Sequence, residues 1–256
     1  MISNDEFPPD VGLTLPTGNG EIDPTSTSER EPRPMCESVT ALRDEVNSLR
    51  WFHQIDFGNG IMSAGAIKTN KLRRISNAVF DRPITDKTVL DIGCWDGAQS
   101  LEAARRGASR VLATDHYVWH HGGDRRCVEL VRKHLAPSIE IMDIDVPELT
   151  PDRVGQFDFV LFLGVLYHVK DPFATLERLA KLVKEVLVVE SRILPLPLPW
   201  PYARFWPGST LNQDPTNWWT FTERCVVDML REIGFRKIKT YRPDWRFRRC
   251  IFHAEW

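Results

Sequence analysis

Residues 89–97 read Val-Leu-Asp-Ile-Gly-Cys-Trp-Asp-Gly, and this run constrains the fold more than any other part of the chain. An apolar segment ends in an acid, Asp91, and then turns through Gly93 and Gly97 into the helix-like segment 98–106. Glycine suits such a turn because a residue without Cβ lets the backbone bend tightly and pass close to a ligand. The run is therefore typical of a strand, a cofactor-binding turn and a helix.

From residue 87 onward, apolar strands alternate with helices. The expected strands are 88–91, 111–114, 139–142, 157–163, 185–190, 235–241 and 250–254, and the expected helices are 99–106, 125–134, 172–181 and 222–233. Nearly continuous apolar strands separated by helices indicate a parallel sheet that is covered on both faces. We expect an α/β fold with a Rossmann-like, doubly wound sheet of seven mostly parallel strands. The last two strands are close in sequence, so a hairpin should make one C-terminal strand antiparallel.

Acidic residues follow the strands that should form the cofactor edge. The run 89–97 lacks the glycine-x-glycine pair of a dinucleotide site, and Asp91 and Asp96 would repel a phosphate but attract an ammonium group. Asp115 could accept from ribose hydroxyls or cap the next helix. Asp143 could accept from the adenine amino group, with Ile144 against the face of the ring, or it could be a solvated cap. These features favour S-adenosylmethionine. The expected cofactor-binding residues are Asp91, Gly93, Cys94, Trp95, Asp96, Gly97, Asp115, His116, Asp143, Ile144, Leu163, Gly164 and Tyr167.

With these motifs the chain resembles the class I S-adenosylmethionine-dependent methyltransferases. Residues 89–97 look like their glycine-rich first motif, and Asp115 looks like their ribose acid. The run 162–172, Phe-Leu-Gly-Val-Leu-Tyr-His-Val-Lys-Asp-Pro, is similar to a narrower branch that contains the enzyme carboxymethylating 5-hydroxyuridine at the tRNA wobble position. Comparable residues of that branch also match Trp51, Glu190, Pro207, Gly208 and Arg249.

One difference separates this chain from the carboxymethylating enzymes. The resemblance implies that they hold the extra carboxylate of their cofactor with a lysine, a tyrosine and a C-terminal arginine. Tyr167 and Arg249 match the last two, but His53 stands at the lysine position, and a neutral imidazole is a poor substitute for an ammonium. We therefore expect methyl transfer to a small aromatic or apolar metabolite. The alternatives are a tRNA wobble-uridine (carboxy)methyltransferase and a non-catalytic cofactor-binding scaffold.

Chemistry is expected after the fourth strand, because the segment 164–168 lies at its carboxyl end, beside the reactive sulfonium. The protein must place the acceptor in line and, if the acceptor carries a proton, remove it. The candidate catalytic residues are Tyr167 as a lining of the methyl pocket, His168 as a base or a helix cap, and His53 as a base or a buried structural histidine. The expected substrate contacts are Trp51, His53, Lys68, Arg192, Tyr202, Trp206 and Arg249.

Composition divides the chain into three parts. Residues 1–34 contain six prolines and no apolar period, so we expect a disordered tail. Residues 35–86 should form a helical and aromatic cap, and 87–256 the methyltransferase domain. The insertion 192–220, rich in prolines and large rings, is expected to be a lid over the acceptor, with a partner-docking surface or a polyproline ligand as the alternative.

Several classes of protein and site are disfavoured. A net charge of -2 and a pI near 6.4 give no global attraction to nucleic acid, although tRNA remains a possible partner beside a small-molecule substrate. Five cysteines without Cys-x-x-Cys spacing favour a reducing cytoplasm, and no apolar run approaches the ~20 residues of a membrane span. A metal cluster of His116, His120, His121 and Asp124 is not expected, because adjacent histidines usually face apart.

Overall fold

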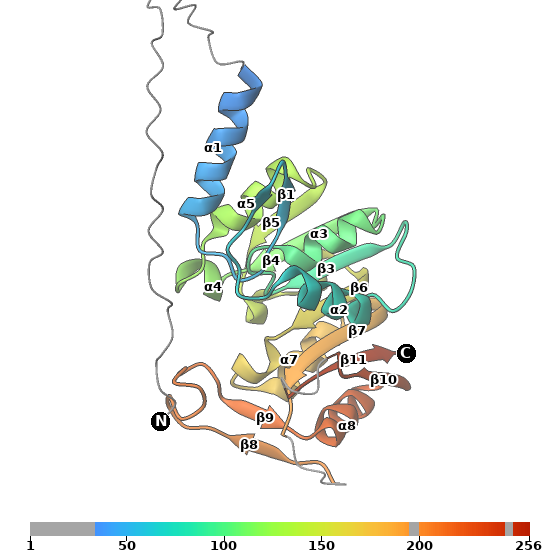
Figure 1. Ribbon diagram of the computed structural model, residues 1–256. Helices are drawn as coiled ribbons and strands as arrows, with labels where there is room; N and C mark the ends of the chain where they lie inside the picture. The colour runs from blue at the N-terminus through green and yellow to red at the C-terminus, as the bar shows by residue number, and fades with distance from the viewer. Residues whose placement is uncertain (1–33, 195–199, 244–247) are drawn as a thin grey trace, which may run out of the picture.

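The computed structural model describes residues 34–194, 200–243 and 248–256. The expected tail, apart from residue 34, and the proline-rich run at 195–199 lie outside the described residues. The described chain begins with α1 (Pro34–Ser48), a hairpin of β1 (Asp56–Gly58) and β2 (Ile61–Met62), and α2 (Thr69–Val79). Figure 1 shows α1 projecting from one end of the molecule, with the β1–β2 hairpin near its base.

A seven-stranded sheet forms the centre of the molecule. Its strands are β3 (Thr88–Ile92), β4 (Arg110–Asp115), β5 (Ile139–Asp143), β6 (Phe157–Leu163), β7 (Val183–Arg192), β10 (Lys237–Tyr241) and β11 (Arg249–Glu255). Their order is β10-β11-β7-β6-β3-β4-β5, and the pairs from β7 to β5 are parallel. Strand β11 lies antiparallel between β7 and β10. The predicted fold class, including the C-terminal hairpin, is confirmed.

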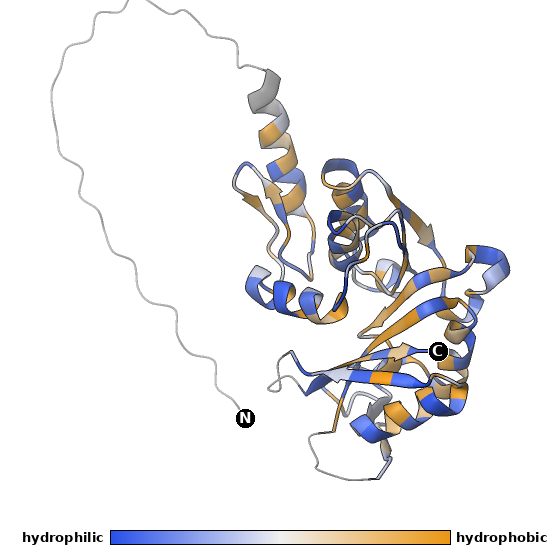
Figure 2. Ribbon diagram, turned by 90° about the vertical axis from the view of Figure 1, so that its right-hand side faces the viewer, coloured by the Kyte–Doolittle hydropathy of each residue, from blue (hydrophilic) through white to orange (hydrophobic). Residues whose placement is uncertain are grey.

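Helices cover both faces of this sheet. They are α3 (Ala98–Arg105), α4 (Tyr117–His120), α5 (Arg125–His134), α6 (Pro151–Val154), α7 (Pro172–Ala180) and α8 (Glu223–Ile233), with the short 3₁₀ turns η1 (Val146–Glu148) and η2 (Leu166–His168). Along β3, Val89 belongs to the apolar cluster that includes residues of α1, α2, α3 and α5, whereas Leu90 belongs to the cluster that includes residues of α7 and α8. Figure 2 shows the resulting apolar strands and the mixed polar and apolar helices around them. Burial on both faces explains why the strands lack polar alternation.

Local signals set the helix boundaries. Asp124 caps α5 by accepting from the Arg126 amide, and Asp171 caps α7 by accepting from Ala174. Thr222 caps α8 in the same way, and Gly234 ends that helix in the left-handed region. Because α5 and α7 follow the sheet edge at which β4 and β6 end, these caps also position the loops that carry the candidate site.

The insertion forms a second small hairpin that was not predicted. Strand β8 (Ala203–Phe205) pairs antiparallel with β9 (Trp219–Phe221), and β9 packs on β7 and η2. Trp200, Tyr202 and Phe205 are large exposed side chains of this segment. No helix within the described ranges is both long and apolar enough to cross a bilayer.

Candidate active site

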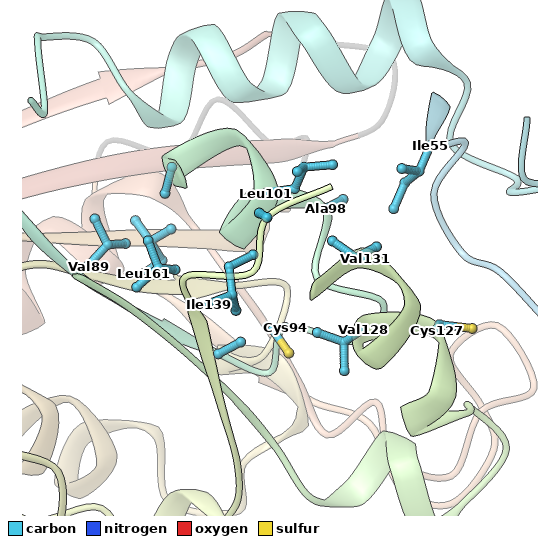
Figure 3. Packing of buried hydrophobic residues seen from close by; sticks show 14 of the residues in the cluster. Ile55, Val89, Cys94, Ala98, Leu101, Cys127, Val128, Val131, Ile139 and Leu161 are labelled. Carbon is cyan, nitrogen blue, oxygen red and sulfur yellow. The ribbon is translucent and has the colours of Figure 1, made fainter. Parts of the chain in front are cut away.

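The loop after β3 is tied to the end of β4. The amides of Gly93 and Cys94 both donate to the Thr114 carbonyl, at 2.8 and 3.0 Å. The loop passes through the left-handed region at Gly93 (φ 74°), Trp95 (φ 55°) and Gly97 (φ 79°). Figure 3 shows Cys94 of this loop beside Val128 of α5, within one apolar cluster. The predicted turn is thus formed, and α3 starts directly from it.

Gly93 is required both by its backbone angle and by its neighbour. A Cβ at this position would lie 2.6 Å from Cγ2 of Val165, whereas a Cβ at Gly58, with a similar φ of 80°, would have no neighbour within 4 Å. We expect Gly93→Ala to lower the free energy of unfolding in urea by about 1–3 kcal/mol. Gly58→Ala, which carries the backbone strain alone, should cost less. If both variants lose the same free energy of unfolding, the close contact with Val165 adds no cost to a Cβ at position 93.

Three carboxylates surround the glycine loop. Asp91, Asp96 and Asp115 are each at most 5% exposed. Burial, followed by the charges of these three aspartates, raises the pKa of the Cys94 thiol well above its usual range. Burial also raises the pKa of Asp91 to about 6, although the Ser100 hydroxyl donates to its carboxylate at 2.6 Å. This concentration of negative charge suits a cationic ligand.

The carboxylate of Asp115 is held by backbone amides. Oδ1 accepts from His116 at 2.8 Å and from Val118 at 3.1 Å, and Oδ2 accepts from Trp95 at 3.0 Å. Burial raises the pKa of this carboxyl, although the three hydrogen bonds favour the ionised form and act in the opposite direction. Since each carboxylate oxygen can accept about two hydrogen bonds, Oδ2 retains one position. Asp115 therefore fixes the glycine loop and can still accept from a ligand hydroxyl.

The cap segment is anchored to the cofactor loop by Asp96. Its Oδ2 accepts from the amides of Phe52 and His53, at 3.0 and 2.7 Å, and its Oδ1 lies 2.6 Å from Nδ1 of His53. The Phe52 ring stacks on Trp95 with centroids 4.1 Å apart. A carboxylate only accepts, so Nδ1 carries a proton and Nε2 of a neutral imidazole is an acceptor. The sequence predicted both residues as site residues but not their pairing.

A partly buried polar cluster lies beside the carboxyl end of β6. Arg249 donates from Nη1 to both oxygens of Glu190, at 2.9 and 2.6 Å, and from Nη2 to the Tyr167 hydroxyl, at 2.7 Å. A Cβ at Gly164 would lie 3.5–3.7 Å from all three side chains. Burial alone would lower the pKa of Arg249, but the negative charge of Glu190 outweighs this effect and the pKa is raised. The guanidinium is thus charged and already paired.

Comparison with known proteins agrees with this arrangement. Residues 66–240 match the family model of a methyltransferase domain, which covers more than half of the chain. The chain belongs to the class I S-adenosylmethionine-dependent methyltransferase family. The fold is also similar to that of the N-terminal domain of EvdMO1, crystallised with SAH and D-fucose, with a TM-score of 0.61 at 19% identity over 86% of this chain and 95% of that one.

Curated relatives of this methyltransferase differ in what their names say they modify. A tRNA U34 carboxymethyltransferase of Alteromonas mediterranea is 30% identical over 118 residues, which are 41% of this chain and 34% of that protein. A ubiquinone biosynthesis O-methyltransferase of Nitrosomonas europaea is 32% identical over 104 residues, which are 40% of this chain and 41% of that protein. The chain thus spans less than half the length of either relative.

His168 holds the insertion of the methyltransferase against the end of β6. Its Nδ1 lies 3.0 Å from the carbonyl and 2.9 Å from the hydroxyl of Thr216, and the amide of Trp218 donates to the Tyr167 carbonyl at 3.0 Å. Burial lowers the pKa of His168, which favours the neutral ring. These contacts support the structural alternative for His168 over a role as base.

The expected substrate-binding residues lie in different surroundings. Trp51 is buried, and its indole donates to the Val46 carbonyl at 2.8 Å, so it supports the cap from inside. Lys68 is exposed at the start of α2. Trp206 donates to the Thr220 hydroxyl at 2.9 Å with the Arg204 guanidinium over its ring. Arg192 is partly buried near Arg249. Burial of Arg192, followed by the positive charge of Arg249, lowers the pKa of Arg192.

The histidines after β4 have an unforeseen partner. Nδ1 of His116 lies 2.7 Å from Oδ1 of Asp143, and Nε2 of His120 lies 2.8 Å from Oδ2. Asp124 instead caps α5, and His121 stacks on Tyr117. His116 and His120 therefore meet at Asp143, on the neighbouring strand, whereas His121 and Asp124 make other contacts.

Proposed function

We propose that the protein transfers a methyl group from S-adenosylmethionine to an oxygen or nitrogen of a small acceptor, and that His53 removes the acceptor's proton. The observation that carries this proposal is the 2.6 Å contact between His53 and the fully buried Asp96. The carboxylate fixes the tautomer with Nε2 as acceptor, and no described residue is hydrogen-bonded to Nε2. The side chain of His53 is 16% exposed, so its edge remains accessible to an acceptor.

The negative site around the glycine loop supports this donor. The donor carries a sulfonium and an ammonium group, and Asp91 lies buried at the end of the strand that leads into the loop. Asp115 has one acceptor position for a ribose hydroxyl. Asp143 and Ile144, at the end of the neighbouring β5, remain the proposed adenine contacts. Gly164 and Tyr167 would border the methyl group at the end of β6.

The insertion supports an acceptor with a planar or apolar face. Phe205 stacks on Trp218 with centroids 6.1 Å apart and meets Trp219 edge-on at 5.4 Å. The hydrogen bonds of His168 and Trp218 hold this aromatic surface beside the end of β6. Its position and its rings favour the lid over a surface for docking another protein.

The second candidate is carboxymethyl transfer to a wobble uridine of tRNA. It is favoured by the 2.7 Å bond between Arg249 and Tyr167, the pair that the resemblance assigns to a carboxylated cofactor. Glu190, which pairs with that guanidinium at 2.6 Å, also matches the branch, so this pair does not separate the two candidates. The second candidate is disfavoured by His53, which stands at the lysine position and is engaged by Asp96 at 2.6 Å. An imidazole held by a carboxylate is a poor substitute for an ammonium group facing a second carboxylate.

Two measurements test this proposal. Native mass spectrometry of the purified protein should show ordinary S-adenosylmethionine or S-adenosylhomocysteine and no carboxylated form. Incubation with S-adenosylmethionine and a library of hydroxylated and nitrogen-containing aromatic metabolites should release S-adenosylhomocysteine with at least one member. A bound carboxylated cofactor, or release only with tRNA, would favour the second candidate. Tight cofactor binding without turnover on either set would favour the scaffold.

We also propose that the protein works in the cytoplasm. The cysteines at 94, 127, 225 and 250 are free, and the structure buries three of them. Burial raises the pKa of Cys127 and Cys250 to about 12, so these thiols are unreactive. Free, protonated thiols suit a reducing compartment.

A further inference from the structure

His116, His120 and Asp143 converge at the edge of the sheet. His116 follows β4, His120 ends α4, and Asp143 ends β5. The ligand atoms of the three side chains all lie within 4.8 Å of one another. Both imidazoles direct a ring nitrogen to the same carboxylate, one to each oxygen.

The fold explains why Asp143 meets His120 and His116, which precede it by 23 and 27 residues. Asp115 and Asp143 are register partners at the ends of the parallel strands β4 and β5. After β4, His116 caps the single turn of α4, in which residues four apart share a face. The rings of His116 and His120 therefore lie together, with centroids 4.6 Å apart and a tilt of 48° between the ring planes. The two rings therefore approach the Asp143 carboxylate from one side.

We propose that His116, His120 and Asp143 bind one Zn²⁺ ion, through Nδ1, Nε2 and a carboxylate oxygen. Two imidazoles and one carboxylate are a donor set that zinc uses in open sites, where water takes the fourth position. The side chains are 43%, 50% and 28% exposed, so an ion can enter from solvent. Zinc would take the place of the proton that each of these nitrogens shares with the carboxylate. Each ring would then be a neutral ligand with its proton on the other ring nitrogen, and an imidazolium would release its second proton to solvent.

Zinc at this site would also affect the cofactor, a consequence that rests on the proposed function. Asp143 is the proposed acceptor for the adenine amino group. Ligation to Zn²⁺ draws negative charge from the Asp143 carboxylate and makes it a weaker acceptor for the adenine amino group, so zinc and S-adenosylhomocysteine should weaken each other's binding. The ion would then act as an inhibitor and take no part in methyl transfer.

The site can be tested without cofactor. Calorimetric titration of the full chain with ZnCl₂ should show one site, and MgCl₂ should show none because magnesium prefers oxygen donors. His120→Ala and Asp143→Asn should each weaken zinc binding by at least about tenfold. His121→Ala is the matched control, because this neighbour faces the Tyr117 carbonyl at 3.0 Å and lies outside the cluster.

Circular dichroism should show that all three variants are folded. Cobalt titration gives a second readout, since a four-coordinate site with two histidines yields visible absorption bands that His120→Ala should abolish. Zinc binding unchanged in His120→Ala, or lost equally in His121→Ala, would overturn the proposal. If zinc binds as expected but excess S-adenosylhomocysteine leaves its affinity unchanged, the site stands and the adenine contact of Asp143 is wrong.

Discussion

Asp96→Asn is expected to lower kcat by about 100- to 10,000-fold, the range that a positioned general base contributes. The asparagine can keep its oxygen toward the amides of Phe52 and His53, so the cap segment stays anchored. Its amide nitrogen then faces Nδ1 of His53, where the carboxylate oxygen now lies at 2.6 Å. An amide nitrogen only donates, so Nδ1 must become the acceptor.

This change reverses the roles of the two ring nitrogens. With the proton on Nε2, the imidazole presents a donor to the acceptor molecule and cannot remove its proton. Two-dimensional ¹⁵N–¹H spectra of the imidazole should show this tautomer switch in Asp96→Asn without any acceptor. Affinity for S-adenosylhomocysteine should fall far less than kcat, because Asp96→Asn removes one of the three negative charges around the loop but leaves Asp91 and Asp115 in place.

The kinetic test uses the acceptor that releases S-adenosylhomocysteine most rapidly. His53→Ala should match the loss of kcat in Asp96→Asn, and the double variant should lose little more, because the two residues act as a unit. Gln54→Ala is a suitable control: its side chain bonds Thr69 beside the same segment but does not contact the imidazole. Full activity in His53→Ala would remove the base from the mechanism.

The sheet could be predicted from sequence because its signals are local. An apolar run of strand length, an acid at its end and a glycine turn occur within nine residues at 89–97, and the pattern repeats along the domain. Burial on both faces favours parallel strands, and parallel strands bring Asp91, Asp115 and Asp143 to one edge. The seven strands and the antiparallel β11 follow from this reasoning.

The pairings within the site depend on long-range contacts that no local pattern contains. His53 and Asp96 are 43 residues apart, and their contact depends on how the cap folds back over the loop. Gly65 illustrates this packing, since a Cβ there would lie 2.0 Å from the carbonyl carbon of His53. Trp51 also depends on such packing: it was expected to contact substrate, and its ring is buried with the indole bonded to the Val46 carbonyl.

Asp115→Ala is expected to weaken binding of S-adenosylhomocysteine by about 10- to 150-fold, which corresponds to the roughly 1.5–3 kcal/mol of a hydrogen bond to a charged acceptor. The variant also leaves the amides of Trp95, His116 and Val118 without their acceptor. Each unsatisfied amide costs about 1–3 kcal/mol if it stays buried, so the loop should loosen and the melting temperature should fall.

The two effects can be separated by measuring binding well below the melting temperature. Calorimetry on samples shown to be folded at 10 °C, a temperature about where domain stability peaks, gives the affinity. Asp145→Ala is the control, because Asp145 also accepts a backbone amide after a strand, at 2.7 Å from Val146, but lies outside the glycine loop. Unchanged affinity in folded Asp115→Ala would show that its carboxylate serves the loop alone. The ribose would then have to bind elsewhere along the edge formed by β3, β4 and β5.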